Sequence, residues 1–476
     1  MRVSYLPSSV RSTLSSFDSC FTAPSFENFV ALVLGWILCS GRHTISRALR
    51  EAKLFGLIDK HHSAAYRFFS RARWDSDRVG RVLFTLLLPF LPKNIEVAVD
   101  DTLCHRSGPQ VFGTGMHHDG SRSNYRGGKR KAAIDYGHNW VLLTVWVPYP
   151  WNPTRGLAVA LILRLYRSKK LCEPASEFRK KTELAAEMIR TLISWLPEGQ
   201  GYRLHVTGDS AYGSRTVIRD LPEHATFVGA MVMNAALYDV KLKPYKGRGR
   251  RPTTGKRLPT PRALARRKNL AWQRTTVRMY GRDVELLLYS FVAVWHRVRP
   301  GKAMRIVITR DPLGRYEDRA YFCTDSAWQA DAIPAKYSNR WPIEVTIGQA
   351  KQILGLEEPR NGWWRRPHGS RRPYRQAGPE SNGQRGRMAV EHTVPFAFLA
   401  YGLVFVWYLN HGKPARDTAR ARKSRPWDRQ KTNPSYADMV TALRREFWVW
   451  RISRYPSLRG VSKKLAGLLG MWLPAA

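Results

Sequence analysis

Apolar residues recur at helical spacing through residues 26–92. The clearest case follows Thr44, a residue type that often caps helices, and consists of Ile45, Ala48, Leu49 and Ala52. Gly56 interrupts the pattern, and a second helix is expected from about residue 63 to residue 73. Two basic helices around a glycine turn fit a helix-turn-helix reader of DNA, but an ordinary helical hairpin is the commoner outcome of such a pattern.

The pattern then changes to the alternation that is typical of β-strands. Ile95, Val97 and Val99 alternate up to Asp100 and Asp101, which predicts a strand ending in two carboxylates. The polar, glycine-rich stretch 106–131 is expected to be a long loop. Further elements complete a mixed α/β order: strands at 140–147, 157–165, 203–207 and 226–232, and helices at 182–196 and 213–221.

The second half of the chain alternates basic stretches with ordered elements. Residues 241–274 carry thirteen basic residues and no acidic one, which indicates a solvated arm. Alternating runs around Gly281 and around residues 311–318 predict two antiparallel hairpins. A helix resumes near Trp341 and a second basic loop occupies 360–387. The apolar segment 394–409 is shorter than a membrane span and predicts a buried helix before a basic region at 413–431.

Composition adds a strong constraint on the partner. The chain has 79 Lys and Arg against 36 Asp and Glu, a net charge of +43. Such an excess favours a polyanion, and nucleic acid first, because each neutralised phosphate releases a counterion. The five cysteines are scattered, and the first residues lack the pattern of a secretory signal. We therefore expect a cytoplasmic protein with no membrane partner and no nucleotide cofactor.

Three acidic positions suit a metal-assisted cleavage of phosphodiesters. They are the Asp100 and Asp101 pair, Asp209 at the end of another predicted strand, and Glu344 on a later helix. Two hard cations a few ångströms apart require several carboxylates on a rigid frame. Each acid by itself could equally be a helix cap or an ion-pair partner. His117, His118 and Asp119 could also bind metal, although their Gly/Ser/Arg surroundings indicate a turn.

The spacing around Glu344 strengthens the metal hypothesis. Tyr337, Arg340, Glu344 and Lys351 follow the pattern Y-x2-R-x3-E-x6-K, whose offsets return to one face of a helix. Pro342 fits only a first helical turn, so Tyr337 and Arg340 could lie on the segment entering the helix. An amphipathic helix with charge pairs from Arg340 to Glu344 and Lys351 is an equal alternative on spacing alone.

Together these strings resemble the DDE transposases of bacterial cut-and-paste insertion sequences. The resemblance rests on YSNRWPIEVTIGQAK (337–351), AVDDTLCHRSG (98–108), HHDG (117–120), GHNWVLL (137–143) and TGDSAYG (207–213). It spans roughly residues 26–411. The fold class it implies is α/β, a ribonuclease-H-like mixed-sheet catalytic core with a β-rich insertion and an N-terminal helical domain.

The resemblance also implies roles for individual residues. The metal ligands, which are also the catalytic residues, would be Asp209, Glu344 and one of Asp100 and Asp101. Neighbouring residues on a strand face opposite ways, so one of the pair should reach the metal; Asp101 is slightly favoured. Residues expected to contact DNA near the cleaved phosphate are Tyr337, Arg340 and Lys351. The expected cofactor is Mg2+, two ions, for which Mn2+ could substitute.

These implications define a function and a domain order. The protein would cut double-stranded DNA at transposon ends and join the 3′-hydroxyls to target DNA, with a homodimer assembled on DNA. The alternatives are a DNA-binding protein of transposase descent that no longer cuts, and a structure-selective nuclease of ribonuclease-H type. The expected units are a helical DNA-binding domain (1–92), two parts of the catalytic core (93–235 and 326–411), the β-rich insertion with its basic arm (236–325) and a basic helical region (412–476).

Overall fold

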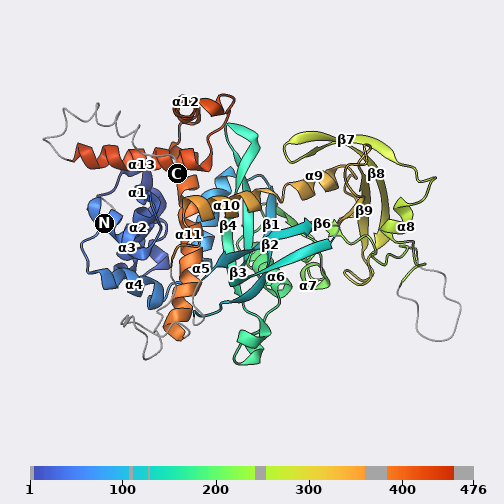
Figure 1. Ribbon diagram of the computed structural model, residues 1–476, viewed down its shortest axis with the longest axis horizontal. Coiled ribbons are helices and arrows are strands. Elements are labelled where there is room, and N and C mark those ends of the chain that lie inside the picture. The colour runs from blue at the N-terminus through green and yellow to red at the C-terminus, as the bar shows by residue number, and fades with distance from the viewer. Residues whose placement is uncertain (1–4, 107–110, 127–128, 242–253, 360–382, 455–476) are drawn as a thin grey trace.

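A large mixed sheet forms the middle of the molecule, with helices from both ends of the chain beside it. The structure is a computed structural model, and it describes residues 5–106, 111–126, 129–241, 254–359 and 383–454. In Figure 1 the blue N-terminal helices lie next to the orange and red C-terminal helices, at the opposite end of the molecule from the yellow strands. The chain therefore returns to its own N-terminal part after building the sheet.

The predicted N-terminal helices are present. They are α1 (Ser8–Ser15), α2 (Ala23–Leu38), α3 (Ile45–Leu54), α4 (His62–Ser70) and α5 (Ser76–Leu87). Helix α3 begins as its sequence predicts, because the Thr44 hydroxyl accepts a hydrogen bond from the backbone N–H of Arg47. Gly56 turns the chain towards α4 with a φ of 68°, a conformation that favours glycine.

The catalytic core predicted by the resemblance is recognisable in the strand order. Its strands are β1 (Asn94–His105), β3 (Lys129–Tyr149), β4 (Asn152–Tyr166), β5 (Arg203–Gly208) and β6 (Ala225–Met231). They lie in the order β4-β3-β1-β5-β6. β3 runs antiparallel to both of its neighbours, β4 and β1, and β5 and β6 run parallel to β1. This mixed sheet, with α6 (Lys181–Ser194) and α7 (Arg215–Ile218) between its later strands, confirms the α/β, ribonuclease-H-like class.

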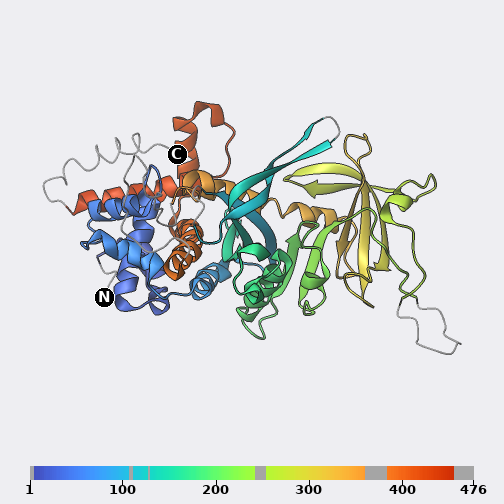
Figure 2. The ribbon, with the colours of Figure 1, turned by 60° about the horizontal axis from the view of Figure 1, so that its bottom comes forward.

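The predicted loop at 106–131 is wrong over much of its length. Residues Gly115–Arg126 form a strand, β2, which pairs antiparallel with the first half of β3. Figure 2 shows this cyan hairpin extending beyond the rest of the sheet. The segment lacks hydrophobic alternation because the β2 residues that face inwards, His117 and Asp119, are polar although both are buried. The predicted turn at His117, His118 and Asp119 is wrong for the same reason, since all three lie within β2.

The two predicted hairpins are confirmed, but they extend the same sheet. They consist of β7 (Gln273–Met279) with β8 (Arg282–Val294) and β9 (Ala303–Arg310) with β10 (Arg319–Cys323). Because β10 pairs with β6, the path of hydrogen-bonded strands continues as β6-β10-β9-β8-β7. The β-rich part is thus joined to the core through backbone hydrogen bonds.

The basic arm predicted at 241–274 is partly folded. Residues 242–253 lie outside the described part of the chain. Beyond them, α8 (Pro261–Ala265) is capped by Thr260 and buries Leu264 against Ile308 of β9. The solvated-arm prediction is therefore wrong for residues 258–265, because Leu258 and Leu264 supply apolar side chains that can cover the sheet.

The remaining helices return the chain to its start. They are α9 (Ala332–Ser338), α10 (Pro342–Ile353), α11 (Gln384–His411), α12 (Pro414–Ser424) and α13 (Tyr436–Ser453). The predicted basic loop at 360–387 lies outside the described residues as far as 382. Helix α11 is long and apolar enough to cross a membrane by length and composition, yet 89% of its apolar window is buried within the fold. It packs against α2, α4, α5, α13 and β4, as expected for a buried helix.

One hydrophobic cluster joins the N-terminal helices, the sheet and the C-terminal helices. Its members include Phe29 on α2, Val99 on β1, Phe396 on α11 and Phe447 on α13. The ring of Phe396 lies edge-on to the rings of Phe29, Trp36 and Phe69. The position of the sheet is thus fixed by the same core that holds the helices.

Candidate active site

Strand register brings two of the predicted acids together. In the parallel pairing of β1 and β5, Val99 lies opposite Gly208, so Asp100 and Asp209 follow at neighbouring positions. One oxygen of Asp209 accepts hydrogen bonds from the backbone N–H groups of Ala211 (2.9 Å) and Tyr212 (3.2 Å). This turn holds the carboxylate of Asp209 at the end of β5.

Gly208 makes that turn possible. A Cβ at this position would lie 2.9 Å from the Cβ of Tyr212 and 3.1 Å from a ring carbon of Phe227. Contacts this short are rare for real side chains, so only glycine lets the chain turn directly into Asp209 here.

Arg340 joins Asp100 to Glu344. Its guanidinium donates from Nη1 to Asp100 and from Nη2 to Glu344, the second at 2.6 Å. Arg340 lies between α9 and α10, and Pro342 begins α10, as the sequence analysis allowed. Asp100, Glu344 and Arg340 thus form one charged group beside Asp209.

The environment of Asp100 is unusual for a carboxyl group. Burial, together with the charges of Asp101 and Asp209, raises the pKa of Asp100 from an ordinary value of 3.8 to about 7, although Arg340 opposes this shift. The charges of Asp100 and Glu344 raise the pKa of Arg340 despite its burial. Several carboxylates crowded into a buried site with one cation form an arrangement that a bound cation would stabilise.

Asp101 lies on the opposite face of β1. Lys181 of α6 donates to its Oδ2 at 2.7 Å, Asn139 of β3 donates to the same oxygen at 3.2 Å, and the Tyr212 hydroxyl donates to Oδ1 at 3.0 Å. All three partners are supplied by the protein itself. The structure therefore brings Asp100, and not the slightly favoured Asp101, to Arg340 and Glu344.

The other two predicted DNA contacts lie near the site in different settings. Tyr337 lies at the end of α9, and the centre of its ring is 5.9 Å from the guanidinium carbon of Arg340. Burial raises the pKa of the Tyr337 hydroxyl. Lys351 points along α10 to the end of β1, where it donates to the Leu103 carbonyl at 2.6 Å and lies 3.0 Å from Glu357. In this structure the Lys351 ammonium is held by the protein.

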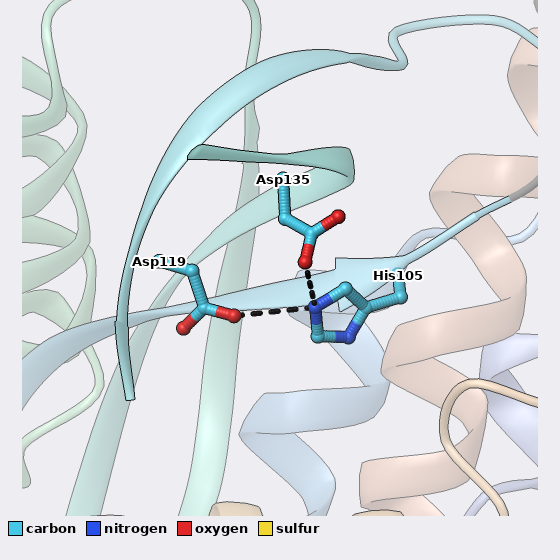
Figure 3. Close-up of side chains that lie close together, drawn as sticks. All are labelled: His105, Asp119 and Asp135. Atoms are coloured by element: carbon cyan, nitrogen blue, oxygen red, sulfur yellow. Dashed lines mark hydrogen bonds and ion pairs between the residues drawn. The ribbon is translucent and has the colours of Figure 1, made fainter. Parts of the chain in front are cut away.

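A second cluster of possible metal ligands lies where β1, β2 and β3 meet. His105 Nε2 is 3.2 Å from Asp119 Oδ2 and 3.5 Å from Asp135 Oδ2 (Figure 3). His105 Nδ1 is 3.0 Å from Glu357 Oε1. The ligand atoms of His105, Asp119 and Asp135 all lie within 4.8 Å of one another. Of the residues that the sequence offered as possible metal ligands, this cluster contains Asp119 but none of Asp100, Asp101, Asp209 and Glu344.

Sequence reasoning missed several residues that organise the site. Tyr212 and Asn139 lie within the strings TGDSAYG and GHNWVLL, which offered a signal, but nothing in the sequence pointed to contact with Asp101. His105 lies within the string AVDDTLCHRSG, but nothing in that string pointed to its contacts with Asp119, Asp135 and Glu357. Lys181 and Glu357 gave no local signal, because their partners are distant in sequence.

Comparison with known proteins agrees with this geometry. A family model described as DDE superfamily endonuclease matches residues 16–283, more than half of the chain. The chain therefore belongs to the DDE superfamily of endonucleases. The match contains Asp100, Asp101 and Asp209 and ends before Glu344.

Two further comparisons complete the findings. Among curated proteins, none matches this chain. Among solved structures, the cryo-EM structure of a piggyBac transposase synaptic complex with hairpin DNA aligns with 98% of this chain and 82% of its own chain, at a TM-score of 0.37 and 10% identity. The fold assignment above rests on strand order and not on this similarity.

Proposed function

We propose that the protein is a transposase that cuts transposon ends and joins their 3′-hydroxyls to target DNA, with Asp100, Asp209 and Glu344 as its metal ligands. One observation carries the proposal: Arg340 bridges Asp100 and Glu344, on α10, at the place where Asp209 ends the neighbouring strand. Three acids from distant parts of the sequence thus meet at one edge of the sheet in a protein of net charge +43.

The donor set fits divalent magnesium or manganese. All three groups offer carboxylate oxygens, which hard cations prefer. A bound cation would offset the burial and the neighbouring negative charges that raise the pKa of Asp100. When bound, two such ions would activate water or a 3′-hydroxyl and stabilise the leaving oxygen. We infer that Asp100 and not Asp101 takes part, because Asp101 is already bound to Lys181, Asn139 and Tyr212.

The protein's own residues would position the DNA. Arg340 donates one hydrogen bond to each of Asp100 and Glu344, and it can exchange one of these carboxylate oxygens for a phosphate oxygen. Tyr337 beside it offers a hydroxyl at the same place. Lys181 and Tyr212, by fixing Asp101, hold β1 in the position that directs Asp100 into the site. Lys351 is paired with Glu357 and would contact DNA only if this ion pair broke. While the pair is intact, Lys351 contributes to DNA binding through its charge alone.

The wider assembly follows from the reaction. Two ends and a target must be oriented together, so we propose a homodimer on double-stranded DNA, acting in the cytoplasm at the nucleoid. No residue needs to form a covalent bond with DNA, because water or a 3′-hydroxyl can serve as the nucleophile.

The proposal is tested by strand cleavage and strand transfer with terminal-repeat DNA and Mg2+. Glu344→Gln should lower nicking by about a thousandfold, the effect of losing several kcal/mol of transition-state stabilisation. Glu198→Gln, at an exposed position outside the site, is the matched control and should cut normally.

Two outcomes would contradict the proposal. Intact nicking by Glu344→Gln would show that the metal site is elsewhere. Cleavage by the native protein without any joined product would assign it to the nucleases of ribonuclease-H type rather than to the transposases.

A further inference from the structure

A cationic cavity lies away from the acids, among the C-terminal helices. It has a volume of about 530 Å³ and is enclosed by the end of α11, the start of α12 and one face of α13. The residues that define it are Trp407, Lys413, Arg416, Asp417, Arg420 and Arg445. None of these residues belongs to the elements that carry Asp100, Asp209 or Glu344.

Three arginines converge on one oxygen at the wall of the cavity. Asp417 Oδ1 lies 3.7 Å from Arg416 Nε, 3.9 Å from Arg420 Nη1 and 3.7 Å from Arg445 Nη1. These are ion-pair distances, and within the described residues Asp417 Oδ1 has no hydrogen-bond partner. Its other oxygen accepts a hydrogen bond from the Tyr408 hydroxyl at 3.0 Å. The guanidinium N–H groups thus surround a carboxylate without saturating it.

The charge of the cavity is not balanced. Lys413 and the three arginines face Asp417 and Glu446, an excess of two positive charges. Arg445 is only 19% exposed, and burial together with the charge of Arg420 lowers its pKa. Positive groups held this close in a partly buried space repel one another, and an anion in the cavity would relieve that repulsion.

The surroundings favour an extended anion. Helix α12 stands out from the body of the molecule in both views (Figures 1 and 2). Beyond the cavity this projection exposes Lys423 and Arg429, and Trp427 is 82% exposed, which is unusual for so large an apolar ring. Cations that continue along a projecting element suit a polymer of phosphates, and exposed aromatic rings are a common companion of such contacts.

We propose that this cavity and α12 form a second DNA-binding surface, which grips a backbone phosphate of duplex DNA between Arg416, Arg420 and Arg445. The assignment of DNA as the ligand rests on the proposed function. A surface remote from the acids would hold the body of the duplex while the end of the same duplex occupies the catalytic site. Asp417 acts as a positioning residue, because it gathers the three guanidinium groups through its buried carboxylate.

The test uses the full chain with Glu344→Gln, so that no cutting occurs, and duplex DNA of arbitrary sequence as the probe. The double substitution Arg416→Gln and Arg420→Gln removes two exposed cations from the cavity. Affinity is measured by fluorescence anisotropy between about 50 and 200 mM salt. The slope of log affinity against log salt should fall by about 1, because one phosphate contact is lost, and affinity at the lower salt by about tenfold.

Matched controls separate this surface from general charge. Arg190→Gln with Arg219→Gln removes the same charge from exposed positions near the end of α6 and on α7, and should leave the slope unchanged. Arg416→Lys with Arg420→Lys keeps the charge and should retain most of the slope. Thermal melting of each variant verifies that the chain is folded.

Three results would overturn the inference. They are an unchanged slope in the Arg416 and Arg420 variant, an equal loss in the Arg190 and Arg219 control, and a cavity that binds inorganic phosphate while the DNA slope stays the same. The last would indicate a site for free anions. Failure of the proposed catalytic function would show separately, as normal nicking by Glu344→Gln in the otherwise native chain.

Discussion

At the scale of single residues, the two adjacent aspartates of β1 have different surroundings. Asp100 faces Arg340, while Asp101 faces Lys181, Asn139 and Tyr212. The strand puts consecutive side chains on opposite faces, so one carboxylate can be a metal ligand while its neighbour holds the strand in place.

Substituting the two aspartates separately should reveal this division. Asp100→Asn should lower Mg2+-dependent nicking by about a thousandfold, because it removes a metal ligand. Asp101→Asn should lower it by about ten- to a hundredfold, the usual effect of losing a group that orients a ligand. Single-turnover nicking rates measure both effects. A larger loss for Asp101→Asn than for Asp100→Asn would reverse the assignment.

The buried carboxyl of Asp100 also predicts a pH dependence of stability without metal. Its pKa of about 7 lies above the ordinary 3.8, so the folded chain holds this proton more tightly than the unfolded chain. The stabilisation of the folded chain by this proton is complete below about pH 4 and is lost as pH rises through 7. The free energy of unfolding should therefore fall by about 4 kcal/mol at most over this range. Urea unfolding in EDTA across this range measures it.

Asp100→Asn provides the control, since an amide does not titrate. The free energy of unfolding of the native chain should fall relative to that of Asp100→Asn as pH rises from 4 to 8. Parallel pH profiles for the two proteins would show that Asp100 ionises without cost in the folded state.

At the scale of elements, the approach of β5 to its following turn depends on Gly208. The hairpins and the first helical cap were predictable because their signals are local: Thr44 precedes its helix directly, and Gly281 separates two alternating runs. The strand β2 was not predictable, because its polar residues pair through the backbone with a partner whose position depends on the whole ribbon.

Alanine substitutions at two glycines should have opposite effects. Gly208→Ala would press a methyl group against Tyr212 and Phe227 and should lower the free energy of unfolding by about 1–3 kcal/mol. Gly348 lies within α10, where an added Cβ would meet nothing within 4 Å. Gly348→Ala should therefore raise the free energy of unfolding by up to about 1 kcal/mol. Chemical denaturation followed by circular dichroism measures both. Equal effects would show that the close contacts at Gly208 relax without cost.

At the scale of the whole molecule, one hydrophobic core and one path of paired strands unite segments from both ends of the chain. The helices α2 and α13 share a cluster with β1, and the β-rich part continues the sheet through β10. The helical side of the molecule and the strands that carry the aspartates are therefore parts of one packed structure.

The net charge of +43 predicts a strong salt dependence of DNA binding. If six to ten phosphates are contacted, affinity for duplex DNA should fall by about 10³ to 10⁵ between 50 and 200 mM salt, because counterions released on binding must be released against a higher concentration. Anisotropy titrations with Glu344→Gln measure this fall. Flat affinity across the range would mean that the charge only keeps the protein in solution.

The sequence alone determined those features whose causes are local or additive. Alternation defined the strands around Asp100 and Asp209, helical spacing defined α3 and α6, and the count of charges indicated a polyanionic partner. The string from Tyr337 to Lys351 and the strings around the aspartates were enough to indicate the DDE superfamily.

Only the tertiary structure decided which groups meet. The contact of Asp100 with Arg340, the ion pair of Lys351 with Glu357 and the position of three arginines around Asp417 all join residues from different elements through packing. A sequence pattern fixes which face of its own element a residue occupies. Which partner lies across from that face depends on how distant elements bury their apolar surfaces together, and that is a property of the whole chain.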